Sequence, residues 1–255
     1  MLLNHKIYGQ GVPVIVIHGL FGSATNLGML IKQLKTDYQV IAVDVRNHGL
    51  SMRHDSMHYD DMANDIIQLM DHLTIEQAHI VGHSMGGKIA MRTALNFPTR
   101  VSSLAVADIA PVNYPPRHDN VFAGLKNIPL ADITTRSDAQ AKLAEHVEEA
   151  GVQQFLLKGL YKNTQGQYGF YYALDTIIAQ YDAISDWPET NKQYDKPVLF
   201  IKGMNSDYIT SAHKSAIAQY FPHAKAKLVQ GTGHWLHAEK PVIFNKIIVD
   251  FLFSH

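Results

Sequence analysis

The sequence predicts an α/β protein with a mostly parallel sheet of about seven to eight strands and helices on both faces. Short apolar runs rich in Val and Ile alternate with segments of helical spacing over most of the chain, which is typical of a parallel sheet covered on both sides. The alternation stops over residues 112–187. A serine between glycines, Ser84, stands where a strand-like run meets a helix-like run. We therefore expect a core of residues 1–111 and 188–255 and an insertion of residues 112–187.

The expected strands are short, continuous apolar runs without polar alternation, a pattern that favours strands buried on both faces. Val12–Ile17 and Gln39–Val43 show it most clearly, and each is followed by a polar loop. In chain order, the expected strands are Val12–Ile17, Gln39–Val43, Ala78–Val81, Val101–Ala107, Pro197–Ile201 and Ala226–Val229.

The clearest expected helix is Tyr59–Leu73, because its apolar residues recur on one helical face. Asp60 and Asp61 lie in its first turn, where carboxylates complement the helix dipole. Pro98 ends another helix, and Pro241 suits the first turn of the last one. In chain order, the expected helices of the core are Asn26–Leu34, Tyr59–Leu73, Lys88–Phe97, Ser211–Phe221 and Pro241–Phe253.

The insertion lacks strand-like runs and is far too long for an ordinary connection between a helix and a strand. Its expected helices are Ala139–Ala150, Val152–Tyr161 and Phe170–Tyr181. Helical insertions of this kind commonly cover an active site and supply its apolar walls. We therefore expect residues 112–187 to form a helical lid.

The composition is that of an ordinary globular protein, with 46% apolar and 18% charged residues. The net charge is −1 and the chain has no block of Lys or Arg, so we expect neither a nucleic-acid partner nor membrane insertion. The absence of cysteine excludes disulfides, thiolate metal ligands and a cysteine nucleophile. The 15 histidines show no spacing typical of a metal site. With no secretory signal at the N-terminus, a cytoplasmic location is expected.

The segment Gly82–Gly86 has the pattern of a nucleophile elbow, a tight turn that holds a reactive side chain at the end of a strand. Glycine is required on both sides because larger side chains would collide with the neighbouring strand and helix. Ser84 is therefore the expected nucleophile, and it needs a base to accept its proton.

The expected base is His234, which follows a glycine in a loop after the last strand. His237 is the alternative. For the acid that orients this base there are two candidates. Asp108 follows the strand after the elbow helix and is favoured, with Ser206 as a hydrogen-bonding neighbour. Asp207 follows the next core strand and remains the alternative acid.

An acyl transfer site also needs N–H donors for the oxyanion of the tetrahedral intermediate. We expect the N–H of Met85, the residue after the nucleophile, and the N–H of Leu20, with Phe21 as the alternative to Leu20. His18, at the start of the same loop, is expected to have a structural role. The polar segment Asp44–Ser51 is also expected to be structural, with Arg46 paired to Asp44 within it.

With these residues in place, the chain resembles the α/β-hydrolases, and among them the bacterial YbfF-type esterases, from end to end. The segments that carry the resemblance are His18–Ser23, Asn26–Gly28, Arg46–Ser51, Gly82–Lys88, Asp108–Val112 and Gly233–Pro241. The resemblance implies the α/β-hydrolase fold and a lidded serine esterase that acts on acyl esters and acyl-CoA thioesters. It also implies that Asp108 is the acid and that Ser206 is the serine of the following turn. The family often has a non-acidic residue at the position of Asp207. The carboxylate in this chain therefore leaves Asp207 as a second candidate for the acid.

The expected function is a serine hydrolase that cleaves carboxylic esters or acyl-CoA thioesters through an acyl-enzyme intermediate, without metal or organic cofactor. The side chains of Phe21, Trp235, Tyr171 and Tyr172 are expected to line an acyl pocket. A C–C bond hydrolase, a perhydrolase and a lyase-type synthase are alternatives on the same fold. A non-catalytic receptor of this fold is the alternative from a different class.

Overall fold

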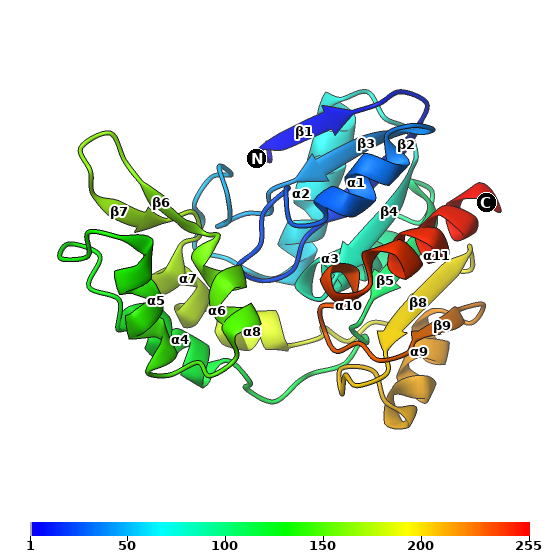
Figure 1. Ribbon diagram of the computed structural model, residues 1–255. Helices are drawn as coiled ribbons and strands as arrows, with labels where there is room; N and C mark the ends of the chain where they lie inside the picture. The colour runs from blue at the N-terminus through cyan, green and yellow to red at the C-terminus, as the bar shows by residue number, and fades with distance from the viewer. Residues whose placement is uncertain (1) are drawn as a thin grey trace.

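The computed structural model describes residues 2–255 and contains a seven-stranded sheet in the order β1-β3-β2-β4-β5-β8-β9. Strand β1 pairs antiparallel with β3, and the other neighbouring strands are parallel (Figure 1). The strands are β1 (His5–Tyr8), β2 (Val12–Ile17), β3 (Tyr38–Val43), β4 (Ala78–His83), β5 (Val101–Ala107), β8 (Val198–Gly203) and β9 (Lys225–Val229). The predicted fold class, a mostly parallel sheet with helices on both faces, is confirmed.

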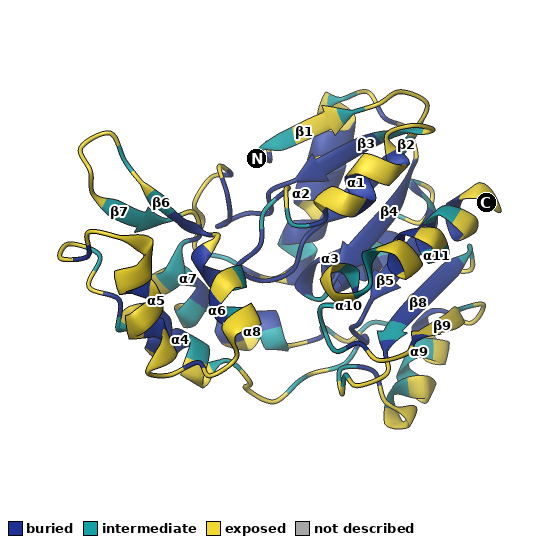
Figure 2. Ribbon diagram, in the orientation of Figure 1, coloured by how far each residue is buried: buried dark blue, intermediate teal, exposed yellow. Residues whose placement is uncertain are grey.

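Helices cover the sheet on both faces, and the alternation of side chains along the strands decides which helices each residue meets. In β2, Ile15 and Ile17 belong to the core cluster that includes the apolar residues of α2 and α3. Val14 and Val16 belong to the opposite cluster, with the apolar residues of α1 and α11. Figure 2 shows the central strands buried between these layers. The core helices are α1 (Gly28–Leu34), α2 (Tyr59–His72), α3 (Met85–Asn96), α9 (Lys214–Tyr220), α10 (Leu236–Glu239) and α11 (Pro241–Phe253).

Strand β1 was not expected from the sequence. It is short, lies at the edge of the sheet and begins with two polar residues, His5 and Lys6, so it lacks a continuous apolar run. A short 3₁₀ turn, η1 (Ser211–His213), occupies the start of the segment expected as one helix, and α9 follows it.

The insertion between β5 and β8 gathers on one side of the sheet, where Figure 1 shows it in green to yellow-green. It contains a two-stranded hairpin that the sequence analysis missed, placed between helices. Its elements are α4 (Asp119–Lys126), α5 (Arg136–Ala144), α6 (Ala150–Leu157), β6 (Leu160–Lys162), β7 (Tyr168–Phe170), α7 (Leu174–Ala179) and α8 (Tyr181–Ser185).

Because of the hairpin, two of the expected helices, Val152–Tyr161 and Phe170–Tyr181, have the wrong bounds. Helix α6 ends before Gly159, and β7 occupies the start of the segment expected as Phe170–Tyr181. The turn between β6 and β7 contains Gly166 at φ +85°, a left-handed conformation that glycine adopts without a steric penalty. The sequence Tyr168-Gly-Phe170 is too short a β signal to be recognised on its own.

The parallel strands end at the same edge of the sheet, so the loops after them meet. Strand β2 leads to the loop of residues 18–23, β4 leads to Ser84, β5 leads to Asp108, and β8 leads to the loop that contains Ser206. Within residues 2–255, no helix is long and apolar enough to cross a membrane.

Candidate active site

Ser84 stands in the tight turn between β4 and α3 with a left-handed backbone, φ 53° and ψ −124°. A Cβ atom on Gly82 would lie 2.2 Å from the Gly86 carbonyl oxygen, and one on Gly86 would lie 2.4 Å from the Ile17 carbonyl oxygen. Both glycines are therefore required by close backbone approach. The left-handed conformation of Ser84 costs of order 1 kcal/mol and is maintained by the surrounding packing.

Ser84, His234 and Asp108 form a continuous hydrogen-bonded line. The Ser84 Oγ lies 2.9 Å from His234 Nε2. On the other side of the ring, His234 Nδ1 lies 2.8 Å from Asp108 Oδ2. In this arrangement the Nδ1–H donates to the carboxylate and the free Nε2 faces the serine hydroxyl, which is the arrangement a general base requires.

Asp108 is fully buried, and both oxygens of its carboxylate accept hydrogen bonds. The Gly203 N–H donates to Oδ1 at 3.0 Å, and the Ser206 hydroxyl donates to Oδ2, the oxygen that also faces His234. Asp108 itself is left-handed, with φ 52°. Ser206 thus lies beside the favoured acid, where the sequence analysis expected a hydrogen-bonding neighbour.

The alternative acid and the alternative base lie away from this line. The Asp207 carboxylate forms an ion pair with Arg117 at 2.7 Å, and its side chain is 73% exposed. The hydrogen bond from Arg117 lowers the pKa of that carboxyl. His237 packs its ring on His83, with 4.3 Å between centroids, and burial lowers its pKa to about 4. Among the described residues, His237 Nδ1 has no hydrogen-bond partner.

Two further side chains, His83 and Tyr208, contact His234 and were not recognised from the sequence. The His83 Nε2–H donates to the His234 carbonyl oxygen at 2.8 Å. The Tyr208 ring stacks on the His234 ring, with centroids 3.9 Å apart and planes 21° from parallel. The only sequence signal for them is position, because His83 precedes the nucleophile and Tyr208 follows the turn that carries Ser206.

The three N–H groups considered for the oxyanion differ in their partners. The Phe21 N–H donates to His48 Nε2 at 3.1 Å and is therefore occupied. Across residues 2–255, neither the Leu20 N–H nor the Met85 N–H donates to a protein acceptor. Met85 is the first residue of α3, where the helix dipole favours negative charge. The geometry thus favours Leu20 over Phe21.

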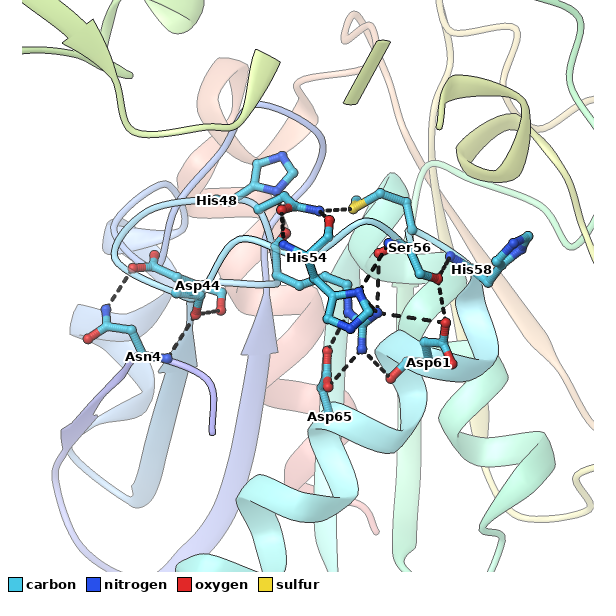
Figure 3. A network of polar contacts seen from close by, with 12 residues as sticks. Asn4, Asp44, His48, His54, Ser56, His58, Asp61 and Asp65 are labelled. Atoms are coloured by element: carbon cyan, nitrogen blue, oxygen red, sulfur yellow. Dashed lines mark hydrogen bonds and ion pairs between the residues drawn. The ribbon is translucent and has the colours of Figure 1, made fainter. Parts of the chain in front are cut away.

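His18 and the segment Asp44–Ser51 form a polar network at the base of the oxyanion loop, part of which Figure 3 shows. The His18 Nδ1–H donates to the Gly19 carbonyl oxygen at 2.7 Å, and the Val45 N–H donates to His18 Nε2 at 3.2 Å. Burial lowers the pKa of His18, so the ring is neutral at neutral pH. These contacts match the structural role expected of His18.

The expected pairing of Arg46 with Asp44 is wrong. Arg46 instead forms a two-pronged ion pair with Asp65 of α2, at 2.7 and 2.9 Å. The Asp44 carboxylate accepts the N–H groups of Ala24 at 2.7 Å and Leu50 at 3.0 Å, so it holds two loops together. Sequence proximity suggested the wrong partner because α2 lies beside Arg46, although Asp65 is 19 residues further along the chain.

A cavity of about 530 Å³ opens above Ser84 and His234, between the core and the insertion. Of the four aromatic residues expected to line it, Phe21 and Trp235 do so, and Tyr171 and Tyr172 do not. The Tyr172 ring is buried behind Phe21, with 5.1 Å between the ring centroids, and the Tyr171 ring packs on Tyr161 at 4.7 Å. The apolar wall from the insertion is formed instead by Val121, Val147, Val152, Phe155 and Leu156.

Lys88, one turn after the nucleophile, is also buried and was not assigned a role from the sequence. Its ammonium donates to the carbonyl oxygens of Ser185 at 2.9 Å and Asp186 at 2.7 Å, where the insertion returns to the core. Burial lowers its pKa to about 7. Lys88 therefore connects α3 to the end of α8.

Within residues 2–255, no group of three or more His, Asp or Glu side chains could hold a metal ion.

Comparison with known proteins agrees with this fold. A family model described as the alpha/beta hydrolase fold matches residues 12–241. Esterase YbfF of Escherichia coli (strain K12) is 41% identical over 230 residues, which cover 90% of this chain and 88% of that protein. The sn-1-specific diacylglycerol lipase ABHD11 of Mus musculus is 38% identical over 250 residues, which cover 94% of this chain and 81% of the lipase.

Among solved structures, one described as a marine microorganism esterase superposes with a TM-score of 0.95 at 35% identity, covering 98% of this chain and 99% of that one. The resemblance inferred from the motifs is thus confirmed over nearly the whole length of the chain. The chain belongs to the family of proteins with the alpha/beta hydrolase fold.

Proposed function

We propose that this protein is a serine ester hydrolase in which Ser84 is the nucleophile, His234 the general base and Asp108 the acid that orients it. The observation that carries the proposal is the unbroken line from Ser84 Oγ through the His234 ring to the buried Asp108 carboxylate, at the floor of the cavity. The similarity to esterases and lipases over nine-tenths of the chain supports the same reaction class. The relatives reported above give no support to a C–C bond hydrolase, a perhydrolase, a lyase-type synthase or a non-catalytic receptor.

In the first half of the reaction, His234 Nε2 accepts the hydroxyl proton while Ser84 Oγ attacks the acyl carbon of the ester. The electron pair of the carbonyl double bond moves to the carbonyl oxygen, and the tetrahedral intermediate carries a negative charge there. The N–H groups of Leu20 and Met85 are the proposed donors to this oxyanion. Loss of one such donor typically lowers the rate by about 10²–10³.

The intermediate then collapses. The bond to the leaving oxygen breaks, and the imidazolium of His234 protonates that oxygen, which leaves the acyl group on Ser84. In the second half, water attacks the acyl carbon while His234 accepts a proton from it. The bond between the acyl carbon and Ser84 Oγ then breaks, His234 returns the proton to Ser84 Oγ, and the carboxylic acid leaves. Asp108 stays ionised throughout and stabilises the imidazolium. Its hydrogen bonds from Gly203 and Ser206 stabilise the carboxylate charge within the protein interior.

Acyl-CoA thioesters are the second substrate class that we propose. A thioester presents the same acyl carbon to Ser84, and its leaving thiolate is more stable than an alkoxide. The family resemblance of the motifs supports this extension.

Residues 112–187 are proposed to act as a lid, since Val121, Val152 and Phe155 of the insertion line the cavity above Ser84. A cytoplasmic location also stays a proposal, and fractionation of the source cells tests it.

A panel of p-nitrophenyl esters and acyl-CoAs with two to about sixteen acyl carbons tests the reaction class. We expect turnover of esters with a burst of p-nitrophenol equal to the enzyme concentration whenever deacylation is slower than acylation. The Ser84→Ala variant should lose turnover while retaining its thermal unfolding profile. Full activity in that variant would reject the proposed nucleophile, and turnover of esters but not of acyl-CoAs would reject the thioester extension alone.

A further inference from the structure

The imidazole of His48 bridges two backbone segments at the edge of the candidate active site. Its Nε2 accepts the Phe21 N–H at 3.1 Å, so its Nδ1 carries the hydrogen and donates to the Arg46 carbonyl oxygen at 3.0 Å. His48 is fully buried, and the ring is drawn in Figure 3 above the segment that follows β3. The mechanism proposed above assigns no role to this side chain.

The hydrogen bond to His48 holds the backbone of Phe21 in an unfavourable conformation. Phe21 is left-handed, with φ 62°, a conformation that residues other than glycine adopt rarely. The same peptide unit joins Phe21 to Leu20, the proposed oxyanion donor. Within the loop, the Gly22 N–H and the His18 Nδ1–H both donate to the Gly19 carbonyl oxygen, at 3.0 and 2.7 Å. Neither bond involves the Phe21 N–H, whose acceptor is supplied by His48 from outside the loop.

The segment that carries His48 is itself fixed on two further sides. Arg46 anchors it to Asp65 of α2. On the side of the insertion, the Ala173 N–H donates to the Asn47 carbonyl oxygen at 2.8 Å. Because α2 and the insertion fix the segment of His48, the hydrogen bond from the Phe21 N–H to His48 fixes the peptide unit that follows Leu20.

We propose that His48 is a positioning residue that holds the oxyanion loop in its active shape, by accepting the Phe21 N–H with its neutral Nδ1–H tautomer. The inference rests on the proposed function, because it gives His48 its effect through the Leu20 N–H. Burial, the neighbouring His18 ring and the Arg53 guanidinium together lower the pKa of His48 to about 3, with the Arg46 carbonyl oxygen opposing them. The ring therefore stays neutral, and its Nε2 stays an acceptor, across the working pH range.

Two substitutions separate the hydrogen bond from the packing. His48→Leu keeps most of the volume but has no acceptor, whereas His48→Gln places an amide oxygen near the former Nε2. We expect His48→Leu to lower kcat by about 10–100-fold with little change in KM, and His48→Gln to recover most of that loss. As a matched control, His79→Leu removes a buried imidazole that bonds Ser103 at the far end of β4, and it should leave kcat unchanged.

Inhibitors report on the oxyanion directly. A trifluoromethyl ketone forms a hemiketal oxyanion with an active-site serine, whereas the matching secondary alcohol cannot. Binding of the ketone should weaken in His48→Leu by the same factor as kcat/KM, while binding of the alcohol should not change. Equal weakening of both ligands, or equal losses in the Leu and Gln variants, would overturn the role of His48.

A measurement on the unaltered protein keeps the inference testable if the variants do not fold. The side-chain ¹⁵N spectrum of His48 should show the Nδ1–H tautomer from pH 5 to 8, since an Nε2–H tautomer would face the Phe21 N–H and could not accept it. Ser84→Ala, assayed alongside, separates the two proposals. Activity retained there rejects the serine mechanism, whereas activity lost there but retained in His48→Leu rejects only the role of His48.

Discussion

The Ser206 hydroxyl donates a hydrogen bond to the same oxygen of Asp108 that accepts the His234 ring N–H. One carboxylate oxygen therefore accepts hydrogen bonds from both Ser206 and His234. The relationship links two loops that are 98 residues apart in the sequence and join only at the edge of the sheet. A change at Ser206 therefore alters the hydrogen bonds of Asp108 without replacing Ser84, His234 or Asp108.

We therefore expect Ser206→Ala to lower kcat by about tenfold, because the variant loses a hydrogen bond that fixes the Asp108 carboxylate beside the His234 ring. The control is Ser211→Ala, an exposed serine of η1, which should leave kcat unchanged. Steady-state kinetics of both variants check the prediction. An unchanged kcat in Ser206→Ala would show that Ser206 does not position Asp108.

Asp108→Asn and Asp207→Asn distinguish the two acids. The first change removes the carboxylate that orients His234 and favours the wrong ring tautomer, so kcat should fall by about 10⁴. The second breaks only an exposed ion pair with Arg117, which contributes little, and should leave kcat within about twofold. Steady-state kinetics of both variants decide the matter. The opposite ranking would transfer the role of the acid to Asp207.

Phe155 tests whether the insertion sets acyl-length preference. Its side chain lies on α6, lines the cavity and packs near the Trp235 ring, with 6.1 Å between centroids. Phe155→Ala enlarges the cavity and should shift the optimum on a series of p-nitrophenyl esters toward longer acyl chains. Tyr161→Phe, on the hairpin away from the cavity, is the control. An identical chain-length profile in Phe155→Ala would refute a selective role for this wall.

His237 should make the protein sensitive to acid. Burial lowers its pKa to about 4, well below the value of about 6.5 in an unfolded chain. Between these two pH values the unfolded state binds more protons than the folded state. The free energy of unfolding should therefore fall as pH falls from about 6.5 to 4.

Replacing His237 by Leu removes this titration together with a buried nitrogen that has no partner among residues 2–255. Denaturant unfolding at several pH values should show a shallower loss of stability in His237→Leu than in the wild type. A dependence on pH as steep as that of the wild type would assign the acid sensitivity to other buried histidines, such as His118.

The sheet and its helices were predictable because strands such as β2 and β3 are nearly continuous apolar runs and the long helix α2 repeats one apolar face. Ser84, His234 and Asp108 were also predictable as neighbours, since a tight glycine turn and the ends of parallel strands bring the loops after the strands together. Edge strand β1 and the β6–β7 hairpin escaped because three or four residues of mixed polarity carry no such pattern.

The contacts that depend on side-chain direction could not be read from spacing. Arg46 reaches α2 instead of its near neighbour Asp44, and Tyr172 turns behind Phe21 instead of into the cavity. The sequence shows His48 only as one polar residue in a loop, whereas the structure shows that its ring nitrogen accepts the Phe21 N–H. Such contacts join segments that are distant in sequence, and the packing of the whole core decides them.

Labelling with a p-nitrophenyl phosphonate, followed by intact-protein and peptide mass spectrometry, tests the central claim most directly. The phosphonyl group should attach once, to Ser84, in the wild type, and released p-nitrophenol should match the labelled fraction. His234→Ala should slow the labelling by orders of magnitude, and folded Ser84→Ala should take up no label. Stoichiometric labelling at another residue, or labelling of Ser84 at an unchanged rate without His234, would contradict the account.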